Sequence, residues 1–355
     1  MRDDGDGKGM RGSPVTIQDV ARIAGVSTAT VSRTLHNPDI VSERTRARVQ
    51  QAVDDTGYAG NAMARSLRRM ETRMIVVLVP NIGNPFFSEI LSGIEASASA
   101  AGYNILIGDT NNDPAKERTF AGYVRGHQAD GMLLLNGRPP YFAADPASVD
   151  HSELPPVVVL CERLPEHRFP TVTIDNEGAA REATAYLTSL GHRRIAHIKG
   201  PGGNILTAER LAGYEAALRQ AGIPGTDGFV QAGDFSINSG RHAARRLLAL
   251  PRPPTAVFCA NDEMAIGAIV EFKAAGHSVP DRVSVVGFDD IQFAGSYEPP
   301  LTTIRQPRRL IGETAMQLMI ERLSGKYVSG GDRVLPAELV VRGSTVAPDA
   351  GSAGV

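Results

Sequence analysis

Apolar residues recur at helical intervals in two short runs between Thr16 and Leu35, with a break between the runs. Thr16 and Ser27 are suited to helix starts, because their hydroxyl oxygens can accept from free backbone N–H groups. Gly25 can adopt the positive φ of a tight turn between the two helices. The pattern therefore predicts two helices that meet at an angle. Their predicted inner faces carry Ile17, Val20, Ala21, Thr30, Val31 and Leu35.

The outer face of the second predicted helix carries short side chains and one arginine. These residues are Thr28, Ala29, Ser32 and Arg33. Short side chains allow a helix to sit deep in the major groove of DNA, where a guanidinium can donate two hydrogen bonds to guanine. The pattern is typical of a helix-turn-helix, although a helical hairpin inside an ordinary globular core could show the same apolar spacing.

The residues that follow extend this N-terminal region and make it basic. Ser42 is expected to begin a third amphipathic helix that ends near Gly57, which completes a three-helix head. The segment from Asn61 to Arg69 contains helix formers but is too short to be stable alone. Between Pro14 and Arg73 there are nine arginines and six acidic residues, whereas the whole chain has a formal charge of −2. Positive charge is therefore concentrated where a phosphate backbone would be met.

From residue 74 onward, continuous apolar runs alternate with stretches of helical period. Strands are expected at 74–79, 103–108, 131–135, 157–160, 171–175, 194–199, 230–232, 255–259 and 284–288. Helices are expected at 85–102, 114–126, 178–190, 208–220, 263–275 and 310–323. Continuous apolar strands suit parallel sheets that are covered on both faces. Two such series of similar length predict an α/β body of two doubly wound lobes, with ligands at the carboxyl ends of the strands.

Polar and aromatic residues follow several of these predicted strands and would face the gap between the lobes. Paired hydrogen-bonding groups beside aromatic faces suit a hydroxylated ring such as a sugar, and paired aromatics also suit a purine or nucleoside. Two alternatives keep these residues structural: Arg210 could pair with Asp289 within one lobe, and Asn261 could cap the next helix. The candidate ligand-binding residues are Phe87, Ser88, Arg163, Arg210, Phe235, Asn261 and Asp289.

Length and composition narrow the class of protein further. A chain of 355 residues is too long for one core, and 42% hydrophobic with 21% charged residues is ordinary for a soluble globular protein. No run of eighteen apolar residues exists, and the polar, Gly-rich start lacks the core of a secretory signal. We therefore expect a cytoplasmic protein that does not associate with membranes.

No catalytic, cofactor or metal site is expected from the chemistry-bearing residues. Cys161 and Cys259 each end an apolar run, which favours buried thiols over a disulfide or a metal pair. The glycines at 200–203 follow a strand, but no P-loop lysine comes after them. His192 and His197 lack metal-ligand partners at useful spacing, and no nucleophile and base stand in a recognisable arrangement.

Four segments in combination resemble the LacI/GalR family of bacterial transcription regulators. They are 16–35, the helix start at 41–46, Ala64-Arg65-Ser66-Leu67, and Pro300-Leu301-Thr302-Thr303-Ile304. The resemblance spans about Pro14 to Ala347. It implies a helix-turn-helix head, a hinge helix and a two-lobed periplasmic-binding-protein-like body in which the chain crosses between lobes near Ile174, Thr303 and Val334. The alternative of a sugar-binding transport protein shares that body, but it requires export and gives the basic head no role.

The resemblance also implies domain limits. The DNA-binding domain would occupy 14–60, and the hinge helix and linker 61–73. From the polar composition of the chain ends, we also expect a disordered lead at 1–13 and a disordered tail at 348–355. The effector-binding and dimerisation domain would occupy 74–347, with lobe 1 at about 74–174 and 304–333 and lobe 2 at about 175–303 and 334–347.

The function implied by the resemblance is that of a dimeric repressor. It would bind a palindromic operator in double-stranded DNA, under control of a small-molecule effector, which we expect to be a sugar. In the family, the positions matching Arg210, Asn261 and Asp289 line the effector pocket. Leu67 would wedge a base step open in the minor groove, or alternatively pack against the first lobe. The expected DNA-binding residues are Thr16, Ser27, Thr28, Ala29, Thr30, Ser32, Arg33, His36, Ala64, Leu67 and Arg68.

Three positions depart from the family pattern. Cys161 stands where many relatives have Asp, so the pocket lacks one acidic acceptor that Glu162 or Arg163 could replace. Gly60 stands where relatives often have Pro, which predicts a looser linker. His36 replaces a common Asn at the end of the recognition helix and could change a peripheral DNA contact.

Overall fold

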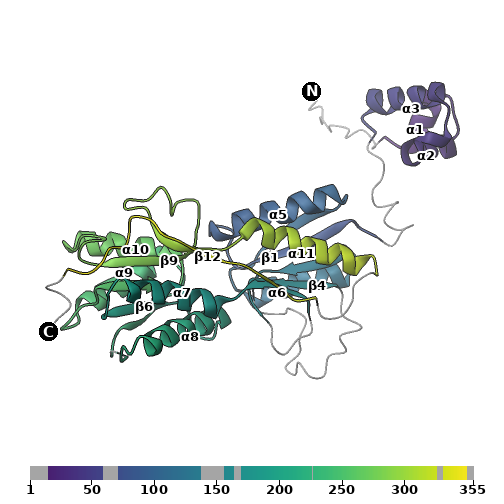
Figure 1. Cartoon of the computed structure of the whole chain (residues 1–355). Coiled ribbons are helices and arrows are strands. Elements are labelled where there is room, and N and C mark those ends of the chain that lie inside the picture. The colour runs from purple at the N-terminus through teal and green to yellow at the C-terminus, as the bar shows by residue number, and fades with distance from the viewer. Residues whose placement is uncertain are drawn as a thin grey trace, which may run out of the picture. The chain divides into compact units, whose positions relative to one another are not determined.

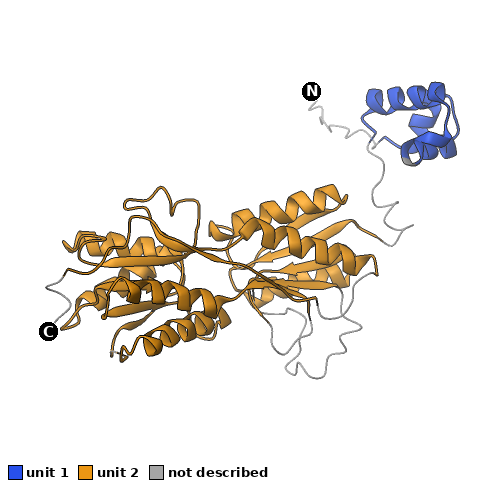
Figure 2. Ribbon diagram, viewed as in Figure 1, with its two compact units in different colours: residues 1–70 blue, residues 71–355 orange. Residues whose placement is uncertain are grey.

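The computed structural model describes residues 15–58, 71–136, 156–163, 169–225, 227–325 and 331–349. The chain forms two compact units, Met1–Met70 and Glu71–Val355, which are coloured separately in Figure 2. The expected hinge residues Ala64, Leu67 and Arg68 lie outside the described residues, as do Gly60 and the side chain of His36. The expected lead at 1–13 and most of the expected tail also lie outside them.

The described part of the first unit, residues 15–58, forms three α-helices and a short 3-10 turn. They are α1 (Ile17–Ala24), α2 (Thr28–His36), η1 (Pro38–Ile40) and α3 (Glu43–Thr56). Thr16 and Asp19 form a capping box at the start of α1, and Gly25 ends that helix with a φ of 61°. Ser27 caps α2 by accepting from the N–H of Thr30. The core of the unit is formed by Val20, Ala21, Ala24, Val31, Val49 and Ala52.

The prediction that Leu35 lies on the inner face of α2 is wrong. Leu35 is 37% exposed, whereas Thr34 is buried beside the fully buried Val31. The hydroxyl of Thr34 donates to the carbonyl of Thr30 at 2.9 Å. A hydroxyl satisfied one turn back within its own helix can enter a small core, so the buried face is centred between Val31 and Thr34.

The second unit contains two six-stranded sheets, each packed between helices (Figure 1). The first has the order β11-β5-β4-β3-β1-β2, with every pairing parallel. Its strands are β1 (Met74–Val79), β2 (Asn104–Asp109), β3 (Gly131–Leu134), β4 (Val157–Leu160), β5 (Thr171–Ile174) and β11 (Arg333–Leu335). The helices of this lobe are α5 (Phe86–Ala100), α6 (Pro114–Arg125) and α11 (Arg308–Leu323).

The second sheet has the order β12-β10-β9-β8-β6-β7, and only its β10–β12 pairing is antiparallel. Its strands are β6 (Ile195–Lys199), β7 (Val230–Ala232), β8 (Ala256–Cys259), β9 (Ser284–Asp289), β10 (Thr302–Arg305) and β12 (Glu338–Val340). The helices of this lobe are α7 (Asn176–Ser189), α8 (Ile205–Gln220), α9 (Ile237–Leu248) and α10 (Asp262–Ala274). The predicted class, two lobes of doubly wound parallel sheet, is confirmed.

The chain crosses between the two sheets three times: after β5, after β10, and between β11 and β12. The first crossing follows Ile174, as the resemblance implies. The other two lie about two residues beyond the expected limits, because β10 pairs with β9 as far as Arg305 and β11 pairs with β5 as far as Leu335. Among the described helices, none is both long and apolar enough to span a bilayer.

Candidate functional site

The exposed face of α2 carries the residues expected to read DNA. Thr28, Ala29 and Arg33 are exposed, and Thr30 and Ser32 are half-buried. The two capping hydroxyls are also engaged in the fold. Thr16 donates to the Asp19 carboxylate at 2.7 Å, and Ser27 lies 2.9 Å from the Thr30 hydroxyl. Arg33 is thus the long cationic side chain on this face of α2. The DNA contacts expected of these residues remain predictions.

Arg48 is a residue of the head whose role the sequence pattern did not reveal. Its guanidinium donates to the carbonyl of Ala24 at 2.5 Å and lies 3.4 Å from that of Gly25. These carbonyls stand at the end of α1, where helical acceptors lack partners. Arg48 therefore fixes the turn of the helix-turn-helix from α3, a contact that links residues 24 positions apart.

In the second unit, the carboxyl ends of strands from both sheets bring the candidate ligand residues toward the junction of the lobes. The first lobe contributes Phe87 and Ser88 from the start of α5 and Arg163 from the segment after β4. Phe87 is buried and makes an edge-to-face contact with Phe86 at 5.1 Å. Ser88 and Arg163 are exposed. Phe87 thus belongs to the core of the first lobe as well as to its cleft end.

Arg210 is the centre of the cluster contributed by the second lobe. Its buried guanidinium donates to Asn176 Oδ1 at 3.0 and 3.1 Å and to the carbonyl of Ala260 at 2.5 Å. It also lies over the ring of Phe288, 3.8 Å from the centroid. The distance to the Asp289 carboxylate is 3.9 Å, which is a loose ion pair. Arg210 thus pairs with Asp289 within one lobe, as the structural interpretation expects, but the two atoms are too far apart for a hydrogen bond. The ligand-binding interpretation of Arg210 stays a prediction.

Asp289 occupies an unusual backbone position at the end of β9. Its φ is 116°, which is costly for a residue with a Cβ and is typical of functional sites. Gln306, in the second crossing, donates to its carboxylate at 2.7 Å. Burial raises the pKa of Asp289 to about 6, against the opposing effects of Arg210 and Gln306.

Asn261 and Phe235 are tied to each other. The Asn261 side chain accepts from the N–H of Met264 at 3.0 Å, which caps α10, and its amide donates to the carbonyl of Phe235 at 2.9 Å. Phe235 has a φ of 70°, and its ring lies so close to Gly200 that a Cβ there would clash with it. Asn261 therefore caps α10 in this structure, as the structural alternative expects. Asn261 and Phe235 both lie at the cleft edge of the second sheet.

Several residues that the sequence did not single out complete this region. Asn176 and Gln306 hold Arg210 and Asp289, respectively. The hydroxyl of Thr207 is buried beside Gly200 and, among the described residues, has no hydrogen-bond partner. Asp262 is fully buried and accepts from Thr303 at 2.5 Å and from the N–H of Ile291 at 2.8 Å. These two contacts give Asp262 a structural role inside the second lobe.

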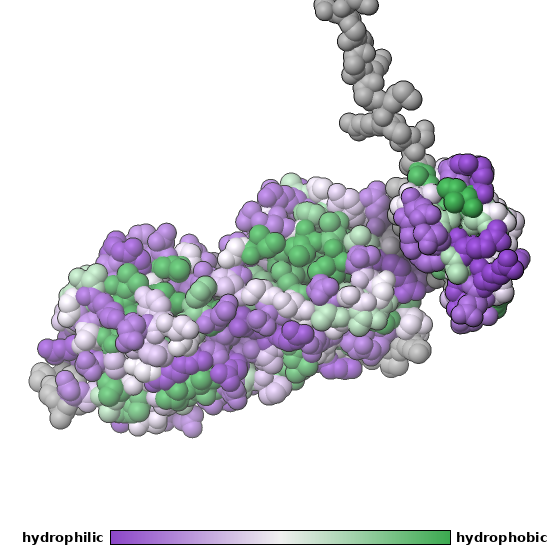
Figure 3. All heavy atoms as spheres, turned by 90° about the horizontal axis from the view of Figure 1, so that it is seen from above, coloured by the Kyte–Doolittle hydropathy of each residue, from purple (hydrophilic) through white to green (hydrophobic). Residues whose placement is uncertain are grey.

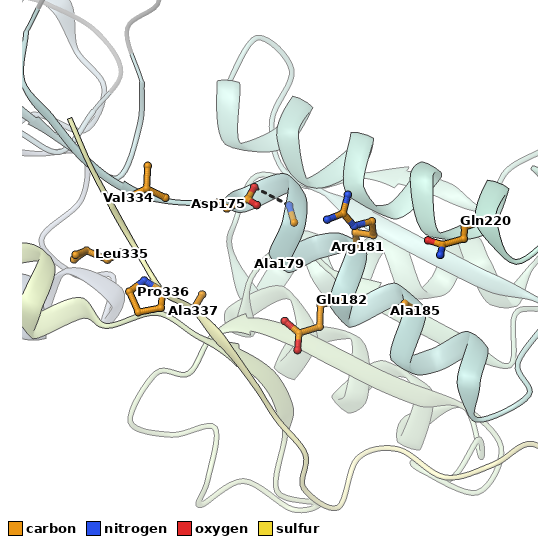
Figure 4. Close-up of a pocket in the computed structure, with 11 residues that line it drawn as sticks. Asp175, Ala179, Arg181, Glu182, Ala185, Gln220, Val334, Leu335, Pro336 and Ala337 are labelled. Atoms are coloured by element: carbon orange, nitrogen blue, oxygen red, sulfur yellow. Dashed lines mark hydrogen bonds between the residues drawn. The ribbon is translucent and has the colours of Figure 1, made fainter. Parts of the chain in front are cut away.

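Two of the hollows on the surface of the second unit are lined mainly by residues outside this cluster. One groove of about 620 Å³ runs between α7 and the β11–β12 crossing (Figure 4). Arg181 and Glu182 project from its helical wall, and Val334 to Ala337 form the opposite wall. Another, of about 400 Å³, lies beside Arg308 at the start of α11. Arg210, Asn261 and Asp289 pack closely and line neither groove, whereas Gln306 lines the second.

The two cysteines do not form a bond or a metal site. Cys161 and Cys259 are buried free thiols, and burial raises the pKa of both. Within the described ranges, no group of three or more His, Cys, Asp or Glu residues is arranged to hold a metal ion.

Comparison with known proteins shows similarity along nearly the whole chain. Residues 16–61 match the lacI family of bacterial regulatory proteins, and residues 184–345 match a periplasmic binding protein-like domain. The transcriptional repressor CytR of Escherichia coli (strain K12) is 47% identical over 330 residues, which cover 93% of this chain and 96% of CytR. The repressor PurR of Photobacterium profundum is 37% identical over an alignment that covers 93% of this chain and 98% of PurR.

Solved structures of similar fold include complexes with DNA and with sugars. The Lac repressor dimer bound to operator and the anti-inducer ONPF has 29% identity and a TM-score of 0.83, covering 94% of this chain and 100% of that chain. The CelR–cellobiose complex of a transcriptional regulator has 34% identity and a TM-score of 0.69, covering 93% and 99%.

Proposed function

The chain belongs to the LacI family of bacterial regulatory proteins and is a DNA-binding transcriptional repressor, not an enzyme, and we propose that a sugar bound between its lobes controls its affinity for an operator. The observation that carries the proposal is the cluster of Arg210 on α8, Asn261 after β8 and Asp289 at the end of β9, all in the second lobe. Similar regulators have been solved with cellobiose and with ONPF. Carbohydrate is therefore our first choice of effector class.

The cluster offers the groups that hydroxylated rings require. Arg210 can donate, Asp289 can accept, and Asn261 can do both once its present partners shift. The unpartnered Thr207 hydroxyl adds a group that can donate or accept at the same edge. The rings of Phe87 and Phe235 supply apolar faces. These rings also suit a base, so a purine or nucleoside is the second candidate.

The remaining ligand residues of the proposal are Ser88 and Arg163, which are exposed on the side of the first lobe. On the DNA side, we assign base and phosphate contacts to the outer face of α2, with Arg33 reading guanine in the major groove. The proposed DNA-binding set also includes the capping residues Thr16 and Ser27, the hinge residues Ala64, Leu67 and Arg68, and His36.

We assign the head to residues 14–60, the hinge helix and linker to 61–73, and the body to 74–347. A palindromic operator requires two heads, so the acting species is a homodimer. A hydrophobic area over the lobe that carries α5 is visible in Figure 3. Ile82, just before α5, and Leu310, in the first turn of α11, are 54% and 45% exposed. These apolar residues support dimerisation through this lobe, in the cytoplasm where the operator DNA is found.

Thermal unfolding against a panel of mono- and disaccharides, sugar phosphates, purines and nucleosides tests the effector proposal. A ligand at about a hundred times its dissociation constant adds roughly 2.7 kcal/mol and raises the unfolding midpoint by several degrees. We expect a sugar to do so. The shift should be lost in Asp289→Asn and kept in Arg219→Gln, which alters an exposed arginine of α8.

The outcomes separate the two candidates. A hit only among purines or nucleosides would replace the sugar by the second candidate. No hit in the panel, or a sugar shift that survives Asp289→Asn, would contradict the proposed pocket.

A further inference from the structure

Apart from the three chain crossings, hydrogen bonds from side chains tie the lobes together on two sides. On one side, Arg308 of α11 donates to the carbonyl of Asp290 at 2.9 Å, next to the end of β9. On the other side, the Asn204 amide of the second lobe donates to the Glu162 carboxylate of the first lobe at 3.1 Å. The second tie lies beside the candidate cluster, because Glu162 acts electrostatically on Arg210 and Asn204 caps α8, the helix of Arg210.

Glu162 is held in position by a strained turn. Its N–H donates to the carbonyl of Leu160 at 2.8 Å, which closes a three-residue turn around Cys161. Cys161 has a φ of 68°, an unfavourable conformation for a residue with a Cβ. The hydroxyl of Thr173 on β5 donates to the carbonyl of Cys161 at 3.0 Å and holds the turn in place. The carboxylate is thereby directed toward the other lobe by backbone geometry.

The side chain of Asn204 makes two hydrogen bonds, one within its own helix and one to the other lobe. Its Oδ1 accepts from the N–H of Thr207 at 3.1 Å and caps α8, while its Nδ2 donates to Glu162. The helix cap fixes the rotamer of Asn204, so its amide donor is presented to the opposite lobe at little entropic cost. The positive charge of Arg163 in the first lobe also opposes the rise in the pKa of Glu209, in the second lobe, that burial causes.

We propose that Glu162 and Asn204 form a polar latch that sets the closure of the two lobes in the ligand-free repressor. They are positioning residues, since they act through the relative placement of the lobes that carry the effector cluster. The latch also makes closure sensitive to the ligand, because a ligand hydroxyl that donates to Glu162 takes the place of the Asn204 amide. This regulatory role rests on the proposed function, but its test uses no effector.

The chain offers a substitution series that alters the latch and preserves the helix cap. Asn, Ser and Asp are all good N-caps. Asn204→Ser removes the donor to Glu162, and Asn204→Asp places two carboxylates face to face. Adding Glu162→Gln to Asn204→Asp restores a hydrogen bond with reversed polarity, because the glutamine amide can donate to the aspartate.

The readout is the distance between spin labels on the two lobes of the full-length protein, without ligand. Labels at Arg118→Cys on α6 and Arg219→Cys on α8 report closure, and the buried native thiols should not react. Labelled chains are mixed with a large excess of unlabelled chains, so that pairs within one chain dominate. Asp113→Asn exchanges the cap of α6 in the first lobe and serves as the control.

We expect the distance distribution to shift to longer values in Asn204→Ser and further in Asn204→Asp. It should return to the wild-type distribution when Glu162→Gln is added, and Asp113→Asn should leave it unchanged. A wild-type distribution in both single variants would overturn the latch, as would a double variant that remains as open as Asn204→Asp. Either result would leave the effector proposal untouched.

Discussion

Asn261 shows how single side chains near the cleft serve both the fold and the candidate site. Its capping role could be predicted because a cap and its N–H partner lie three residues apart. Its bond to the carbonyl of Phe235 could not, because that partner lies 26 positions away and meets Asn261 only when β7 and β8 join one sheet. The contacts of Asn176 with Arg210 and of Gln306 with Asp289 could not be predicted either, for the same reason. Local chemistry could be predicted, whereas partners brought together by topology could not.

His197 carries the clearest pH dependence of a single residue. Its ring stacks between Tyr214 and Phe258 and bonds the carbonyl of Phe258 at 3.0 Å. Burial lowers the pKa of His197 from 6.5 to about 4. As pH falls below 6.5 the unfolded chain therefore binds a proton that the folded protein does not, and the free energy of unfolding decreases until about pH 4.

Replacement of this ring should remove that dependence. Between pH 7 and pH 5, His197 lowers the free energy of unfolding by about 2 kcal/mol. In His197→Phe, denaturant unfolding should show a decrease smaller by this amount, and the exposed His242→Phe should follow the wild type. Equal pH profiles for His197→Phe and wild type would show that the buried ring does not remain neutral.

At the scale of elements, continuous apolar runs predicted the buried strands, whereas the helix α9 and the strands β10, β11 and β12 were not predicted. The continuous apolar runs of β1, β4 and β8 are fully or almost fully buried, as parallel strands covered by helices require. Helix α9 was not predicted, because Ile237-Asn238-Ser239-Gly240-Arg241 begins it with few helix formers. Its buried Gly240 lies against the backbone of Met264 in α10. Packing between helices thus overrode local propensity.

The contact between α5 and α11 gives a prediction at this scale. A Cβ at Gly312 would clash with the carbonyl of Ile90, and one at Gly93 would clash with that of Arg309. Gly312→Ala must therefore separate two helices of the first lobe and should lower the free energy of unfolding by about 1–3 kcal/mol or more. Gly122→Ala on α6, where a Cβ meets nothing within 4 Å, should instead raise it by about 0.5–1 kcal/mol.

Denaturant unfolding of the two variants beside the wild type measures both changes. If the two substitutions shifted the midpoint in the same direction, the close approach of α5 and α11 would not be a constraint on the lobe.

At the scale of the whole molecule, the order of the strands connects the proposed effector cluster of the second lobe with the first lobe. The sheets are joined by three crossings, and Asp289 contacts one of them through Gln306. A ligand that moves the Asp289 carboxylate therefore acts on the segment that leads into α11 of the first lobe. The first strand of that lobe, β1, follows the head in the sequence. Apolar periodicity predicted two lobes, but the crossings came from the family resemblance, because β11 and β12 are three residues each and carry little pattern.

Selection of bound sites from random duplex DNA, followed by titration of the selected site, tests the central claim most directly. We predict an inverted repeat that the full-length protein binds at least about a thousandfold more tightly than random DNA. Arg33→Ala should lose about 1–3 kcal/mol on the selected site and little on random DNA. Selection of no common sequence, or equal affinity for selected and random DNA, would contradict the account of this protein as an operator-binding repressor.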